Sequence, residues 1–429
     1  MHTVRFEPAE KHAEVAAGTL ISEAALQAGV ELNVPCGGQG RCGRCAVIVR
    51  EGRVRRRSTQ RLSPEDVAAG YALACQTVVE GDLVVEIPPQ ERIERRIASE
   101  KKALDVVYPY EYDAVRDQPI QRYYLDLGPP SLEDQTDDWA RIQRRLRQLD
   151  GPAHITASLA VLQQMGRTLR QGEWQVTAVV ELDTWDRPDG PARLVDLLPG
   201  DQTEVSWGAA VDIGTTTVTA YLVDLVSGKA VARAADYNAQ IGRGEDVISR
   251  IVFASKGQGL VDLQRLVRET INTVLGRACR RAKVDPRQVH RATIAGNTTM
   301  LHLLLAVPPE PIRLTPYIPT VNNWPTVLAD ELGLAIHPQA SVDCLPGVAS
   351  YVGADITAGM ISTGACESKS LSLFLDIGTN GEMVLGDCDW LISCACSAGP
   401  AFEGAGVHYG MRATEGAIEE VWIAGDTHE

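Results

Sequence analysis

Four cysteines near the beginning of the chain have the side chains and the spacing of an iron–sulfur ligand set. Three lie in PCGGQGRCGRC, with five and then two residues between them, and the fourth follows in LACQT. They are Cys36, Cys42, Cys45 and Cys75. Four thiolates hold a [2Fe–2S] cluster, and glycines suit the loop around it because they allow positive φ angles and close backbone approach. The pattern predicts a [2Fe–2S] cluster.

Zinc is the main alternative, because four cysteines also form structural zinc sites. Zinc ribbons usually carry two C-x2-C pairs, whereas Cys75 has no second cysteine two or three residues away. Four unrelated buried cysteines are a further alternative, although three cysteines within ten residues of a glycine-rich loop speak against it.

Two strand–turn–strand patterns in the second half of the chain carry residue types that bind phosphate. WGAAVDIGTTTVTAYLVDLVSG turns at residues 212–217, and LSLFLDIGTNGEMVLGDCDW turns at residues 376–381. We call these turns the first and the second phosphate loop. Each presents backbone N–H groups and hydroxyls to phosphate oxygens. A single turn of this kind is a weak signal, but a repeat with matching strands predicts a nucleotide site.

Each loop begins with an aspartate at the end of a strand. Asp212 and Asp376 can hold Mg²⁺ through water, because Mg²⁺ keeps much of its hydration shell, and we expect them to be the catalytic residues. Phosphoryl transfer needs little beyond such positioning and charge neutralisation. The residues predicted to bind ATP are Gly214, Thr215, Thr216, Thr217, Gly378, Thr379, Asn380 and Gly381.

A third segment, ATIAGNTTMLHLLL, predicts a short strand, a turn and a helix. Gly296 and Asn297 in its turn join the predicted nucleotide site, and an ordinary helix cap is an equal alternative for Asn297. GEDVISRI carries Glu245 and Asp246, which either meet the nucleotide metal or orient water, or, as is more common for such acids, begin a helix, where the dipole favours them.

The elements around these motifs predict a multidomain α/β and α+β protein. Residues 1–90 alternate strands with one helix around the cysteine loop and resemble [2Fe–2S] ferredoxins, which implies a β-grasp fold. Residues 91–118 are predicted to be a linker, and 119–203 a small α/β middle domain without chemistry of its own. Residues 204–429 contain both phosphate loops and form the third predicted domain.

The composition excludes several classes of protein. The 429 residues are 45% hydrophobic and 23% charged, as in globular proteins, and the net charge of −15 argues against a nucleic-acid partner. No apolar run is long enough to cross a membrane, and the N-terminal residues MHTVRFEPAE lack the apolar core of a signal peptide. We expect a cytoplasmic protein without disulfides or a membrane partner.

The two phosphate loops resemble those of the superfamily of acetate kinase, sugar kinases, Hsc70 and actin. A [2Fe–2S] domain, a linker, a small domain and such an ATPase occur together in the reductive activators of corrinoid proteins, and the chain resembles this family over nearly its whole length. The motifs that carry the resemblance are PCGGQGRCGRC with LACQT, DIGTTTVTAYLVD, GEDVISRI, AGNTTM, LPGVASYVGAD, DIGTNGEMVL and CSAGPAFEGAG.

The resemblance implies ATP-dependent transfer of one electron from the cluster to a corrinoid protein, reducing Co(II) to Co(I). The implied cofactors are the [2Fe–2S] cluster, ATP and Mg²⁺. The partner would be a corrinoid iron–sulfur protein or the corrinoid subunit of a methyltransferase, with an unknown low-potential electron donor and a homodimeric assembly. Ser397, in CSAGPAFEGAG, is expected to face the nucleotide or the corrinoid, and a plain turn is an equal alternative.

One departure from the family concerns the adenosine-binding segment, which should follow the second phosphate loop at some distance. The sequence ends at Glu429, so we expect the C-terminal part of the ATPase domain to be missing and ATP to bind weakly. Two other functions stay open. One is a [2Fe–2S] electron-transfer protein with an inactive ATPase part, and the other is a kinase of the same superfamily with a redox-sensing cluster.

Overall fold

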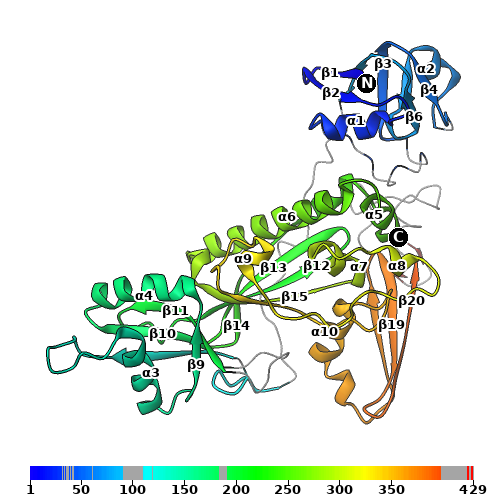
Figure 1. Cartoon of the computed structure of the whole chain (residues 1–429). Helices are drawn as coiled ribbons and strands as arrows, with labels where there is room; N and C mark the ends of the chain where they lie inside the picture. The colour runs from blue at the N-terminus through cyan, green and yellow to red at the C-terminus, as the bar shows by residue number, and fades with distance from the viewer. Residues whose placement is uncertain are drawn as a thin grey trace.

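The computed structural model describes residues 1–30, 32, 34, 38, 40, 43–59, 61–89, 110–117, 119–182 and 191–396, and the backbone of 397, 423–424 and 427–428 (Figure 1). Within these residues no helix combines the length and the apolar character that crossing a bilayer requires. Most of the predicted linker, and the cysteines Cys36 and Cys42, lie outside the described residues.

The N-terminal domain is a five-stranded sheet covered by one helix. Its strand order is β2-β1-β7-β3-β5, and β1 and β7 run parallel. The helix α1 buries Ile21, Ala24 and Ala25 against the sheet, because these residues share one helical face. The elements are β1 (His2–Glu7), β2 (Lys11–Val15), α1 (Ile21–Gln27), β3 (Ala46–Glu51), β4 (Val54–Arg56), α2 (Pro64–Ala68), β5 (Tyr71–Leu73), η1 (Ala74–Gln76), β6 (Thr77–Val79) and β7 (Leu83–Glu86).

The small domain is a four-stranded sheet in the order β8-β10-β11-β9, with both its helices contributing to one core. Asp137 and Ser158 cap these helices by accepting backbone N–H groups. The other face of the sheet packs Val179 and Val195 against Leu225 of the next domain, which explains why β10 is buried on both faces. The elements are β8 (Ile120–Asp126), α3 (Asp138–Gln148), β9 (Ile155–Ala157), α4 (Leu159–Gln171), β10 (Gln175–Glu181) and β11 (Ala192–Pro199).

The first lobe of the third domain is a six-stranded sheet in the order β14-β13-β12-β15-β17-β16. The strands β12, β15 and β17 run parallel, and the long helix α6 covers β13 and β14. The elements are β12 (Trp207–Ile213), β13 (Thr217–Asp224), β14 (Lys229–Tyr237), η3 (Ala239–Gly242), α5 (Val247–Ala254), α6 (Gly259–Ala282), η4 (Pro286–Gln288), β15 (Val289–Gly296), α7 (Thr298–Leu304), α8 (Glu310–Arg313), β16 (Val327–Leu328), α9 (Ala329–Leu332) and β17 (Ser341–Cys344).

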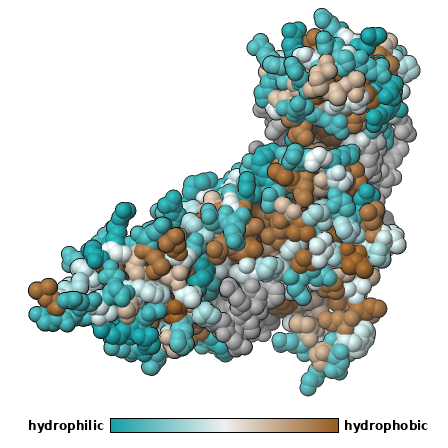
Figure 2. Space-filling view, viewed as in Figure 1, coloured by the Kyte–Doolittle hydropathy of each residue, from teal (hydrophilic) through white to brown (hydrophobic). Residues whose placement is uncertain are grey.

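The second lobe is a three-stranded sheet, β18-β19-β20, with helix α10 packed on one face through Ile356, Met360 and Val384. Figure 2 shows apolar side chains gathered over this sheet, and Leu373 and Ile377 of β18 are 59% and 83% exposed. The elements are α10 (Ala354–Thr363), η5 (Ala365–Glu367), β18 (Ser372–Ile377), β19 (Asn380–Gly386) and β20 (Leu391–Ser397); β21 (Ile423–Ala424) and β22 (Thr427–His428) form a separate pair.

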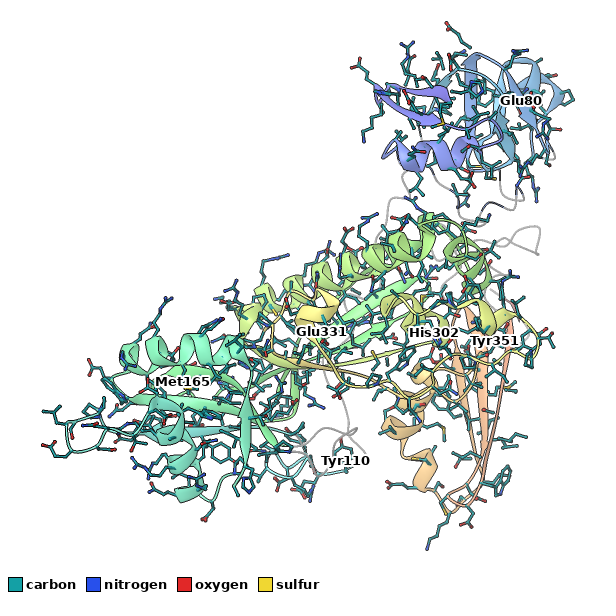
Figure 3. The ribbon with its side chains drawn as sticks, in the orientation of Figure 1. Glu80, Tyr110, Met165, His302, Glu331 and Tyr351 are labelled. Carbon is teal, nitrogen blue, oxygen red and sulfur yellow. The ribbon has the colours of Figure 1, made fainter. Side chains whose placement is uncertain are left out.

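The N-terminal domain rests on the end of the first lobe formed by α5 and α6, and the small domain lies at the opposite end of the long sheet (Figure 1). Figure 3 shows Met165 within the small domain, and His302 and Tyr351 toward the side of the first lobe that meets the second lobe. The cysteine loop and the phosphate loops therefore lie toward the same end of the molecule.

Candidate functional site

The two phosphate loops face each other across the junction of the two lobes. The hydroxyls of Thr216 and Thr379 lie 3.4 Å apart. Each loop is a tight turn, because the N–H of Gly214 bonds the carbonyl of Thr217 and the N–H of Gly378 bonds that of Asn380, both at 2.9 Å. The structure thus brings together two segments that are far apart in the sequence.

Four carboxyl groups gather around these loops: Asp212, Asp355, Asp376 and Glu382. Burial, followed by the charges of Asp355 and Asp376, raises the pKa of Asp212 to about 6 and that of Glu382 to about 7. Burial and the charge of Asp376 raise the pKa of Asp355 to about 6. Asp212 is partly exposed to solvent, but the surrounding protein removes enough water, and the two neighbouring carboxylates are close enough, to raise its pKa.

This crowding of negative charge suits a hard divalent cation, whose preferred ligands are oxygens. Among the described residues these carboxylates do not form a compact set of three directly coordinating ligands. The arrangement therefore fits a cation that keeps several of its waters better than one enclosed by side chains. Asp355 was not among the residues predicted from the sequence, because nothing in GADITAG resembles a known ligand motif.

The first phosphate loop is held from behind by buried polar side chains. Asn238 donates to the carbonyl of Gly214 at 3.0 Å, and Asn297 donates to the Thr215 hydroxyl at 3.1 Å. Asn297 also caps α7, so the helix-cap reading describes it, and its bond to Thr215 places it beside the first phosphate loop. Gly296 packs so closely that an added Cβ would lie 2.8 Å from the carbonyl oxygen of Ile213.

Arg250 is the central support of this loop. Its guanidinium is fully buried and donates to the carbonyl of Thr215, to the carbonyl of Gly244 at 2.8 Å and to the side chain of Gln240 at 3.0 Å. Charged hydrogen bonds of this kind are strong when they are shielded from water. The loop and the segment after η3 are therefore tied to one side chain.

The cysteine loop brings two of the predicted ligands together. The sulfurs of Cys45 and Cys75 lie 3.3 Å apart, and each residue is only 1% exposed. The N–H of Ala74 bonds the carbonyl of Cys45 at 3.0 Å, which holds the two segments in register. Gly40 has a φ of +73°, and an added Cβ would lie 2.7 Å from Gln76, so this position requires glycine. Two buried thiols at this spacing fit a thiolate-bound cluster.

The remaining residues predicted from the sequence lie at the following positions in the fold. Thr217 begins β13, while Asn380 and Gly381 begin β19 beside the second phosphate loop. The backbone of Ser397 pairs with Asn380 at the end of β20, and its side chain is not described. Asp246 caps α5 by accepting the N–H of Ser249 at 2.7 Å, so the helix-start reading describes it.

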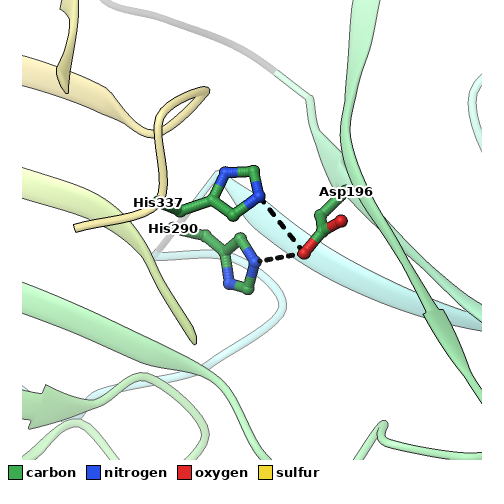
Figure 4. A group of neighbouring side chains, drawn as sticks. All are labelled: Asp196, His290 and His337. Carbon is green, nitrogen blue, oxygen red and sulfur yellow. Dashed lines mark hydrogen bonds and ion pairs between the residues drawn. The ribbon is translucent and has the colours of Figure 1, made fainter. Parts of the chain in front are cut away.

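A cluster that sequence reasoning did not find joins the small domain to the first lobe (Figure 4). Asp196 Oδ2 lies 3.1 Å from Nε2 of His290 and 3.3 Å from Nε2 of His337. Nδ1 of His290 faces the guanidinium of Arg122 at 3.4 Å, and Nδ1 of His337 accepts the N–H of Gln339. Both Nε2 atoms therefore carry hydrogens and donate to Asp196, which satisfies the cluster without a metal.

The pKa values support this reading of the cluster. Burial lowers the pKa of His290 and keeps the imidazole neutral. Burial alone would raise the pKa of Asp196, but hydrogen bonds from His290 and His337 outweigh it and hold the pKa well below the ordinary value. The triad thus acts as a buried hydrogen-bonded clamp between two domains.

Comparisons with known proteins match the successive domains of the chain to described protein families. Family models match a 2Fe-2S iron-sulfur cluster binding domain at residues 4–80, the RACo linker region at 111–204, the RACo middle region at 207–368 and the C-terminal ASKHA domain of RACo at 370–429. A solved structure titled reductive activator for corrinoid, iron-sulfur protein is 39% identical, with a TM-score of 0.64; the match covers 100% of this chain and 68% of that one.

The chain belongs to the family of reductive activators of corrinoid proteins. The corrinoid activation enzyme RamQ of Eubacterium limosum is 30% identical over 424 residues, which cover 97% of this chain and 65% of RamQ. The [Co(II) methylated amine-specific corrinoid protein] reductase of Methanosarcina barkeri is 28% identical over 224 residues, 50% of this chain and 40% of that protein. The chain spans about two thirds of the length of RamQ.

These matches confirm the predicted family and the predicted fold class. The match to a 2Fe-2S iron-sulfur cluster binding domain at residues 4–80 supports a [2Fe–2S] cluster, and the ASKHA match supports ATP binding.

Proposed function

We propose that the chain carries out ATP-dependent reduction of a corrinoid protein from Co(II) to Co(I), with the electron supplied by a [2Fe–2S] cluster. The proposal rests on the combination of two sites in one chain: two buried cysteines whose sulfurs converge, and two phosphate loops that face each other. The cysteine-containing domain also contacts the lobe that carries the first phosphate loop, through Arg44 and Glu245. The names of RamQ and of the Methanosarcina barkeri reductase support a corrinoid partner.

In this proposal Cys36, Cys42, Cys45 and Cys75 hold the cluster, which supplies a one-electron carrier. The backbone and hydroxyl groups of the two phosphate loops, with Gly296 and Asn297 behind them, bind the phosphates of ATP. Asp212 and Asp376 position Mg²⁺ through its waters, and the buried charges nearby favour its binding.

Nucleotide can assist an unfavourable electron transfer only through a difference in binding free energy between two states of the protein. The facing loops belong to different lobes, so a nucleotide held between them favours a closed arrangement of the lobes. Arg250 connects the first loop to the segment on which the N-terminal domain rests, which gives ATP a route to the electron carrier.

The decisive experiment mixes the reduced protein with a Co(II) corrinoid protein, with and without ATP and Mg²⁺, and follows the Co(I) absorbance. We expect ATP to increase the yield of Co(I), and the variant D376N to lose this increase while it keeps the cluster absorption. Reduction that is equally fast without ATP would favour the electron-transfer alternative. No Co(I) with either class of corrinoid partner would refute the proposal.

Two further parts of the proposal concern assembly and electron supply. We propose a low-potential electron donor for the cluster and a homodimer in solution. Light scattering of the purified protein tests the homodimer, and a monomeric mass at micromolar concentration would contradict it.

A further inference from the structure

The first lobe presents a binding surface to the cysteine-containing domain, formed by residues 242–258, which we call the docking segment. Arg44, next to the cluster ligand Cys45, forms an ion pair of 3.0 Å with Glu245. The N–H of Val34 donates to the carbonyl of Gly242 at 3.0 Å, and Arg243 reaches the carbonyl of Leu32 at 3.5 Å. These contacts bind the cluster loop itself rather than the far side of its domain.

One side chain of the docking segment reaches the loop that surrounds the cluster. The ammonium of Lys256 lies 3.4 Å from the point where a Cβ on Gly38 would stand, and the Cβ of Cys75 lies 3.8 Å from the same point. A cavity of about 510 Å³ opens along this junction, and Gly38, Cys75 and Lys256 all line it. A positive charge from the first lobe is therefore placed beside a predicted cluster ligand.

The charge of Lys256 bears directly on the redox chemistry of the cluster. Reduction adds one negative charge, so a nearby cation stabilises the reduced form more than the oxidised form and raises the reduction potential. Arg243 contributes less to this effect, because its guanidinium is bound to Asp262 at 2.8 Å and the two charges offset each other. Lys256 is thus the residue of the segment with the most direct influence.

We propose that the ATPase lobe tunes the cluster by docking: while the N-terminal domain rests on residues 242–258, Lys256 raises the reduction potential, and release of the domain lowers it. The domain would accept an electron more readily when docked and give it up more readily when released. This inference rests on the proposed [2Fe–2S] cluster, whose presence the same experiment tests separately.

The test is a redox titration of the whole chain with dithionite and mediators, in which the EPR signal of the reduced cluster gives the midpoint potential. We expect K256Q to have a lower potential than the parent and K256R to keep the parent value. The matched control is K229Q, which removes the same charge at the start of β14, at the end of the sheet that contacts the small domain.

A second variant separates docking from simple charge effects. E245K adds positive charge near the cluster loop, so direct electrostatics alone would raise the potential. It also places two cations at the Arg44 contact, so loss of docking should lower the potential instead. Hydrogen exchange of the peptide containing Val34 should accelerate in E245K, because its N–H bonds Gly242 only in the docked state.

The outcomes distinguish the inference from the proposed function. Absence of iron, sulfide and the EPR signal in the parent would refute the cluster and the proposed function with it. An intact cluster whose potential is the same in the parent, K256Q and K229Q would overturn only the tuning by Lys256. A potential that rises in E245K, with unchanged exchange at Val34, would refute the claim that loss of the Arg44–Glu245 contact releases the domain and lowers the potential.

Discussion

Replacing Asp355 with asparagine should stabilise the third domain in the absence of metal. Asp355 lies at the start of α10, where burial and the charge of Asp376 raise its pKa to about 6. Its Oδ1 accepts the N–H of Ile356 at 3.0 Å, and the carbonyl oxygen of asparagine can keep this bond. The substitution therefore removes a poorly solvated charge without removing its hydrogen bond.

The size of the effect follows from the pKa. A carboxyl group whose pKa is about 6 instead of 3.8 carries about 3 kcal/mol of unfavourable free energy in the folded state at neutral pH. Part of this charge is screened by solvent in the cleft, so we expect a gain of about 1–2 kcal/mol in the free energy of unfolding. For a domain of this size the melting temperature should rise by about 2–8 °C.

The gain in stability of D355N over the parent should increase with pH. The pKa of Asp355 is higher in the folded state than in the unfolded state, so the folded protein binds an additional proton between pH 3.8 and about 6, and the penalty grows over this interval and is complete above it. The D355N variant should therefore melt higher than the parent at pH 8, and the difference should fall to about half by pH 5 and disappear only below about pH 4. Mg²⁺ should stabilise the parent more than it stabilises D355N, because the variant binds the cation less tightly.

Scanning calorimetry at five pH values between 4 and 8, with and without Mg²⁺, measures these effects. The control is D389N, which removes the same charge at an exposed position between β19 and β20. A D355N protein that melts below the parent at pH 8, or a difference that does not change with pH, would refute the electrostatic reasoning.

Three other predictions follow from the supports around the two sites. Substituting Cys75 with alanine should abolish the visible absorption and the EPR signal of the reduced cluster, and their persistence would show that the sulfur is not a ligand. Substituting Arg250 with alanine should cost about 3–5 kcal/mol of stability in urea unfolding and weaken ATP binding in calorimetry, since four buried contacts are lost; normal values for both would contradict its role. Acidification from pH 7 to 5 should lower the hydrogen-exchange protection factors of amides in β11 and β15, which correct for the slower intrinsic exchange at low pH, because burial lowers the pKa of His290 and stability is lost as pH falls; a matching loss in H290Q would exclude the histidine as the cause.

The sequence was most informative where chemistry lies within a short segment. The spacing of the cysteines and the repeated DIGT turns pointed to the family and the fold class, because each motif is local and each turn needs particular residues. Asn297 shows the same principle, since one side chain both caps α7 and supports Thr215.

The sequence was least informative where distant segments meet. Asp196 lies in β11, His290 in β15 and His337 between α9 and β17, so no spacing along the chain could bring them together before the sheets were arranged. Glu245 was expected to meet the nucleotide metal or to begin a helix, yet its carboxylate forms an ion pair with Arg44 at 3.0 Å. The sequence did not reveal this contact, because the position of the N-terminal domain could not be read from either segment alone. The predicted boundaries of the domains and the roles of the site residues stay predictions.

Arg250 binds the carbonyl groups of both Thr215 and Gly244, and this limits how the sequence can vary at this position within the family. One guanidinium restrains both the loop that would hold ATP and the segment that carries the redox domain, so a substitution there alters two activities at once. Relatives that lost the N-terminal domain would be released from half of this constraint. In such relatives we expect the residues on the outer side of α5 to vary in sequence. The arginine itself should be retained, because it still supports the loop that would hold ATP.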